Sequence, residues 1–266
     1  MKDYKYNFGF VLSGGGARGF AHLGVLQALN EAGIYPGIIS GTSAGAIVGA
    51  LYCDGYKPKE ILKLMNTGSR LNFMRPTLPR YGVLQISGVV KILEHNLRAK
   101  KFSDLKIPLV VAATDLNHGH ITYFSDGEIL NPVIASSSIP VLFNPVIIND
   151  VHYVDGGVMD NMPVHPIEND CRFLIGSFVN PTGYASKFSS LIDIAERTFI
   201  LNMYKEALEK SGKFDLYIAP PELRGFSILD PEKGEEIFNV GYKATKSILN
   251  STDIEKKFFS AEENSD

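Results

Sequence analysis

One stretch of the chain sets the expected fold: Pro36-Gly37-Ile38-Ile39-Ser40-Gly41-Thr42-Ser43-Ala44-Gly45. Its apolar start predicts a short strand, and its end has the Gly-x-Ser-x-Gly pattern of a sharp turn between a strand and a helix. Gly41 and Gly45 leave room for neighbouring backbone at such a turn. Negative charge that develops beside Ser43 would meet the partly positive start of the helix. Ser43 is therefore a candidate nucleophile, and the alternative is a helix-capping serine among small residues.

A glycine-rich loop comes earlier, between an expected strand at 8–12 and an expected helix at 20–32; it reads Ser13-Gly14-Gly15-Gly16-Ala17-Arg18-Gly19. Residues without a Cβ allow several backbone amides to converge on one point. The amides of Gly14, Gly15 and Gly16 could form an oxyanion hole for a reaction at Ser43. The loop could instead bind phosphate in a nucleotide-binding or regulatory protein. No carboxylate follows the second strand, where a dinucleotide fold places its ribose ligand.

Strands and helices continue to alternate along the rest of the chain. Strands are expected at 107–115, 145–148, 152–154, 172–179 and 214–219, and helices at 44–51, 59–65, 87–97, 131–138, 190–208 and 234–250. Residues 66–85 lack periodicity and are interpreted as an irregular flap that covers a pocket or rests on lipid, or as an ordinary surface loop.

The sequence Asp155-Gly156-Gly157 follows an expected strand. An aspartate at this position can face an open cleft, and the alternative is a common Asp-Gly turn. Two histidines, His118 and His120, could bind a metal ion, but no third ligand is evident beside them in the sequence. A solvated hairpin is therefore favoured there, and no metal site is predicted.

Composition limits the classes of partner. The chain has 266 residues, 45% of them hydrophobic, which is enough for one large core. Its net charge of −3 argues against nucleic acid. Cys53 and Cys171 have no metal-binding or redox spacing. The apolar run at 8–12 is too short for a signal peptide. We expect a cytoplasmic protein, with peripheral contact at the inner face of the membrane left open.

Four blocks in this order resemble the patatin-like phospholipases, the bacterial branch in particular: Gly14-Gly15-Gly16-Ala17-Arg18-Gly19, Gly41-Thr42-Ser43-Ala44-Gly45, Ala135-Ser136-Ser137-Ser138-Ile139-Pro140 and Asp155-Gly156-Gly157. The resemblance implies a patatin-like α/β fold, a three-layer sandwich with a central, mainly parallel sheet. It also implies a dyad in which Ser43 is the nucleophile and Asp155 its base. The glycine loop would be the oxyanion hole, and Arg18 would help to hold that loop.

The resemblance covers residues 8–168, which we expect to be the catalytic core. Residues 169–250 would complete the same domain, and 251–266 would form a charged tail. The implied activity is hydrolysis of a lipid acyl ester, a phospholipid or an acylglycerol, without a cofactor. A catalytically silent lipid-binding scaffold is a further alternative. The sequence predicts neither the oligomeric state nor the acyl-chain preference.

Overall fold

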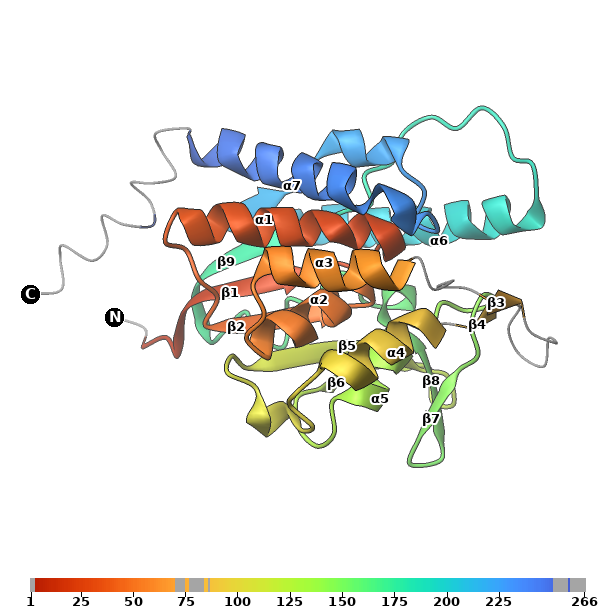
Figure 1. Cartoon of the computed structure of the whole chain (residues 1–266), viewed down its shortest axis with the longest axis horizontal. Helices are drawn as coiled ribbons and strands as arrows, with labels where there is room; N and C mark the ends of the chain where they lie inside the picture. Colours follow the sequence, from red (N-terminus) through yellow and green to blue (C-terminus); the bar gives the residue numbers. More distant parts are fainter. Residues whose placement is uncertain (1–2, 70–74, 77–83, 86, 251–257, 259–266) are drawn as a thin grey trace, which may run out of the picture.

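The structure is a computed structural model that describes residues 3–69, 75–76, 84–85, 87–250 and 258. Its centre is one sheet with the strand order β10-β9-β1-β2-β5-β8-β7 (Figure 1). Strand β6 also pairs with β5, on the edge opposite to β2 and β8. The strands are β1 (Tyr6–Leu12), β2 (Ile38–Thr42), β5 (Leu109–Asp115), β6 (His120–Phe124), β7 (Val146–Ile148), β8 (Val151–Asp155), β9 (Cys171–Ser177) and β10 (Leu216–Ile218).

The strands from β10 to β5 pair in parallel, whereas β6, β7 and β8 join the sheet antiparallel. Strands β2 and β5 are buried along their whole length, as expected for parallel strands covered on both faces. The predicted α/β fold with a central, mainly parallel sheet is therefore confirmed.

Helices cover both faces of the sheet. Along β1, Phe10 and Leu12 pack into one core cluster with α1, while Val11 packs into a second cluster with Ala207 of α6. Helix α7 lies alongside α1 (Figure 1). The helices are α1 (Phe20–Glu31), α2 (Ala44–Cys53), α3 (Pro58–Ser69), α4 (Ser87–Asn96), α5 (Leu130–Ser136), α6 (Leu191–Lys210) and α7 (Gly234–Leu249). Among the described residues, no helix is both long and apolar enough to cross a membrane.

The register of the sheet brings two strand ends together. Strand β2 pairs with β5 up to Thr42 opposite Ala112, and β8 pairs with β5 from Asp155 opposite Ala113. Because β6 occupies the other edge of β5, β2 and β8 must share one edge. They run in opposite directions, so their C-terminal ends meet head to head. Ser43, which follows β2, and Asp155, which ends β8, are thereby brought together.

The irregular flap predicted at 66–85 needs correction where the structure describes it. Helix α3 continues to Ser69, four residues beyond the predicted end, and β3 (Arg75–Pro76) pairs antiparallel with β4 (Leu84–Gln85). The remaining residues of the predicted flap lie outside the described residues. The expected charged tail at 251–266 also lies outside them, except for residue 258.

Candidate active site

Ser43 occupies a strained turn between β2 and α2. Its backbone has φ 54° and ψ −119°, a conformation that non-glycine residues rarely adopt. Its amide donates to Oγ of Ser136 (2.8 Å), which in turn donates to the carbonyl of Ala112 (2.6 Å). Strain of this kind costs about 1–3 kcal/mol and persists where surrounding contacts enforce it. The turn is the geometry that exposes a nucleophilic serine at the end of a sheet.

The two glycines of the pattern are required by close packing. A Cβ on Gly45 would lie 2.2 Å from the carbonyl oxygen of Leu12, and one on Gly41 would lie 2.7 Å from the carbonyl carbon of Gly45. Helix α2 therefore starts in direct contact with the end of β1. This contact places Ser43 beside the glycine loop, which begins after Leu12.

Asp155 is fully buried at the end of β8. Its Oδ1 accepts from the amide of Gly157 (2.8 Å), while its Oδ2 accepts no hydrogen bond of standard geometry from the described residues. Burial raises the pKa of Asp155 to about 7, although the nearby Ser43 hydroxyl and the Gly157 amide act to lower it. Close to neutral pH, this carboxyl group can therefore both accept and return a proton.

The glycine loop lies against Ser43, and two asparagine side chains hold Gly14. A Cβ on Gly14 would lie 3.1 Å from Cβ of Ser43. The Gly14 amide donates to Oδ1 of Asn161 (2.9 Å), and its carbonyl accepts from Nδ2 of Asn180 (2.7 Å). The Gly14 amide is therefore occupied in this structure. Within the described chain, the amides of Gly15 and Gly16 have no hydrogen-bond partner.

The rest of the loop is fixed by residues 226–228. Gly16 has φ 54°, and a Cβ there would lie 2.2 Å from the carbonyl oxygen of Ile228. That carbonyl accepts from the amide of Ala17 (2.8 Å), and Nε of Arg18 donates to the carbonyl of Phe226 (2.8 Å). Arg18 thus ties the loop to a distant segment. Gly19 packs on the start of α2, where its Cβ would lie 2.5 Å from Cβ of Ala44.

The segment after Asp155 connects the three parts of the site. Gly156 packs beside β2, since a Cβ there would lie 3.0 Å from Cγ2 of Thr42. The Thr42 hydroxyl donates to the carbonyl of Asp160 (2.8 Å). The amide of Asn161 donates to Glu206 (2.6 Å), and Glu206 also forms an ion pair with Lys210. A partly buried ion pair on α6 therefore supports the turn that holds Gly14.

Asn161 and Asn180 are supporting residues that no motif in the sequence marks. Asn161 follows Asp155 closely in the chain, and Asn180 follows a parallel strand, as Ser43 does. These positions are the only signals for them that the sequence contains. In the described chain, six buried side-chain polar atoms have no hydrogen-bond partner, and four belong to Arg18, Asp155, Asn161 and Asn180. Because such atoms are rare in stable proteins, their concentration here is typical of a functional site.

Histidine has no place beside Ser43. His22 is fully buried, and its ring nitrogens bond Ser177 Oγ and the Ser13 carbonyl, each at 2.8 Å. Burial lowers the pKa of His22 to about 4, so the ring is neutral at physiological pH. All six histidines lie among the described residues, and none is hydrogen-bonded to Ser43 or Asp155. Asp155, whose pKa is influenced by hydrogen bonding to the Ser43 side chain, is therefore the candidate base for Ser43.

A pocket opens at Ser43. Its described lining is mostly apolar and comes from α1, α2, α3, α4 and the segments around 139–143 and 228–231. Six apolar side chains that define it are Phe20, Ile47, Met65, Ile139, Phe143 and Ile228. An apolar pocket that ends at a strained serine fits an acyl chain whose carbonyl group reaches the hydroxyl.

Fold and site together define an α/β protein in which two opposed strands bring a serine in a strained turn and a buried aspartate together. A family model for patatin-like phospholipase matches residues 10–167. The chain belongs to the patatin-like phospholipase family.

Several known proteins are similar to this chain. "Lysophospholipase NTE1" of Coccidioides immitis is 29% identical over 91% of this chain and 17% of its own length. "Patatin-like phospholipase domain-containing protein 6" of Homo sapiens is 26% identical over 90% of this chain and 20% of its own. An uncharacterized NTE family protein of Mycobacterium tuberculosis is 32% identical over 59% of this chain and 44% of its own. The chain therefore spans less than half the length of these curated relatives.

Among solved structures, VipD from Legionella pneumophila matches 93% of this chain and 67% of its own, with a TM-score of 0.55 and 17% identity. At this identity, the similarity concerns the fold alone.

Proposed function

We propose that this protein is a serine hydrolase that uses a Ser43–Asp155 dyad to cleave an acyl ester of a lipid. The lipid is either a phospholipid or an acylglycerol. The observation that carries the proposal is the head-to-head meeting of β2 and β8, which puts a strained serine next to a buried carboxyl group. Family membership and the apolar pocket support a lipid substrate. Residues 8–168 supply both members of the dyad.

The proposed reaction has two steps. Oγ of Ser43 attacks the ester carbonyl while its proton passes to Asp155, and Asp155 then protonates the departing alcohol. Water, which loses a proton to the same carboxylate, then attacks the acyl-enzyme, and Asp155 returns that proton to Oγ of Ser43 as the fatty acid is released. No cofactor takes part in this scheme. A single carboxyl group can serve in both steps because burial raises its pKa to about 7, close to neutral pH.

Charge on the tetrahedral intermediate would be stabilised by the unpartnered amides of Gly15 and Gly16, close to the start of α2. Gly14 positions these donors, because its peptide group is fixed on both sides by Asn161 and Asn180. Of the predicted motif residues, Gly14, Arg18 and Gly19 then act as supports for the loop.

We expect the pH profile of hydrolysis to report Asp155. Below a pKa of about 7 the base is protonated, so kcat/KM should fall by about tenfold per pH unit and should reach a plateau at higher pH. The measurement is kcat/KM for a short-chain nitrophenyl ester between pH 5 and 9. A flat profile down to pH 5 would contradict the assignment of Asp155 as the base.

The apolar pocket predicts a chain-length effect. Ile139 is half-buried in the pocket wall, so Ile139→Trp should shorten the space for an acyl chain. We expect kcat/KM for long-chain esters to fall at least tenfold more than for acetyl or butyryl esters. Ile147→Trp, at an exposed position on β7, is the matched control and should leave the preference unchanged. An equal loss for all chain lengths would argue against this pocket as the acyl site.

The substrate class is tested with a lipid panel. Lysophospholipids, diacyl phospholipids and acylglycerols are incubated with the protein, and free fatty acid is measured by mass spectrometry. Lysophospholipids come first because relatives carry the name lysophospholipase. Release from at least one class, absent in Ser43→Ala, is expected. No release from any of them, with short esters still cleaved, would restrict the activity to non-lipid esters.

We also propose a cytoplasmic location for the protein and peripheral contact with the membrane.

The competing prediction, phosphate binding by Gly14–Gly19, has less support. The amides of Gly14 and Ala17 are occupied, and residues 16–19 form a short 3-10 helix. Fewer donors are therefore available than a phosphate loop requires. Saturable thermal stabilisation by ATP or NAD without esterase turnover would reverse this preference.

A further inference from the structure

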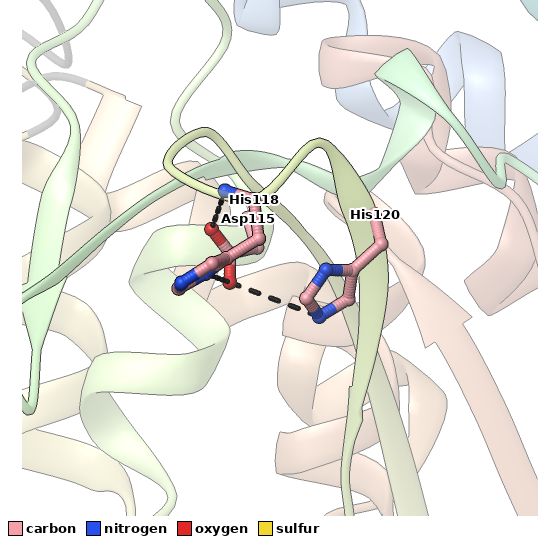
Figure 2. A group of neighbouring side chains, drawn as sticks. All are labelled: Asp115, His118 and His120. Carbon is pink, nitrogen blue, oxygen red and sulfur yellow. Dashed lines mark hydrogen bonds and ion pairs between the residues drawn. The ribbon is translucent and has the colours of Figure 1, made fainter.

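A histidine–aspartate cluster lies at the end of β5, apart from the proposed dyad. Asp115 ends β5, and His120 begins β6 directly opposite it in the antiparallel register. His118 lies in the connecting turn, and its ring faces the same carboxylate (Figure 2). Asp115 is a candidate third ligand that is not evident beside the two histidines in the sequence, because only the pairing of β5 with β6 brings it there.

From this geometry we propose that Asp115, His118 and His120 form a binding site for a divalent transition-metal ion of the zinc type. One ligand atom from each side chain lies within 4.8 Å of the other two. Oδ2 of Asp115 is 2.8 Å from Nδ1 of His118 and 3.7 Å from Nε2 of His120. Ligands around tetrahedral zinc are about 3.3 Å apart, given metal–ligand bonds of about 2.0–2.1 Å. Small side-chain rotations would therefore suffice.

The carboxylate is held in place for this role. Asp115 is almost fully buried, and its Oδ1 accepts from the amides of Asn117 and His118, each at 2.9 Å. The other carboxylate oxygen of Asp115, Oδ2, faces His118 and His120. The ligand that sets the geometry is thus held in one orientation by the backbone, as a metal ligand should be.

The ligand set selects the ion. Two imidazoles and one carboxylate suit zinc, cobalt, nickel and copper, whereas magnesium and calcium prefer oxygen ligands alone. Both histidine side chains are more than half exposed, so an ion can enter from solvent and water can complete its coordination. The bound ion would join β5, the turn and β6. Because Thr114 Oγ1 donates to the carbonyl of Asp155 (3.0 Å), this strand end also borders the proposed dyad.

The test measures zinc binding by untagged protein, with a chromophoric chelator as competitor and with thermal unfolding. We expect one ion per chain and a saturable rise in Tm of roughly 5 °C at a hundredfold excess over the dissociation constant. Magnesium and calcium should give no shift. Cobalt should give the visible absorption bands of an ion with nitrogen and oxygen ligands.

His118→Ala and His120→Ala should each weaken zinc binding at least tenfold and should abolish the Tm rise. Both side chains are exposed, so the metal-free variants should unfold at the wild-type temperature. His95→Ala, at an exposed histidine on α4, is the matched control and should bind as the wild type does. Equal zinc affinity in the wild type and both cluster variants, or no stoichiometric binding at all, would overturn the proposal whether or not the protein hydrolyses esters.

Discussion

Replacement of Ser43 by alanine is expected to lower kcat/KM for ester hydrolysis by about 10⁴-fold or more. No other described hydroxyl combines the strained turn with a buried carboxyl neighbour, so no second nucleophile should take over. Alanine keeps the Cβ, and the Ser43 amide that donates to Ser136 is unchanged. The variant should therefore fold, and the loss should appear in kcat with unchanged unfolding temperature.

Ser137→Ala provides the matched control. This serine lines the same pocket, but its hydroxyl donates to the carbonyl of Val133 (2.9 Å). Its loss should reduce kcat/KM by no more than about tenfold, because a single structural hydrogen bond contributes about 1 kcal/mol. Activity that survives in Ser43→Ala but disappears in Ser137→Ala would reassign the nucleophile.

Asp155→Asn should separate activity from stability. Asparagine can still accept from the Gly157 amide through its oxygen but cannot act as a base. We expect kcat/KM to fall on the order of 10³ to 10⁴-fold. The measurement is initial rates at pH 8 alongside urea unfolding at several pH values.

The stability change in Asp155→Asn has a defined sign. Burial raises the pKa of Asp155 from 3.8 to about 7, so the folded state holds this proton more tightly than the unfolded state does. In the wild type, this group's contribution to the free energy of unfolding falls as pH rises from about 4 to about 7, by up to about 4 kcal/mol. Asp155→Asn lacks that decrease and should gain stability relative to the wild type between pH 4 and pH 8. The control Asp126→Asn, at an exposed turn, should not gain stability relative to the wild type. The same pH dependence in the wild type and Asp155→Asn would contradict the raised pKa.

The fold could be predicted largely from local patterns. Apolar runs and turn residues marked the strands that hold Ser43 and Asp155, and Gly41 and Gly45 marked the turn between β2 and α2. These signals suffice because strands, helices and turns depend on neighbouring residues. The end of α3 was missed because residues 66–69 carry no clear apolar periodicity.

The details of the site depend on pairing between distant residues, which local patterns do not contain. The register of β8 on β5 decides that Asp155 meets the end of β2, and no residue near Asp155 encodes that register alone. In the same way, the bond from the Gly14 amide joins residues 147 positions apart. Likewise, local patterns place Asp115 in a buried strand but do not show that this strand pairs with the one that begins at His120.

The central claim is that Ser43 is the nucleophile, and covalent labelling tests it most directly. The wild-type protein is inactivated with a fluorophosphonate, digested, and analysed by peptide mass spectrometry. The account predicts one adduct per chain, on Oγ of Ser43, that forms in parallel with loss of esterase activity. An adduct on a different residue, or full inactivation with Ser43 unmodified, would contradict it.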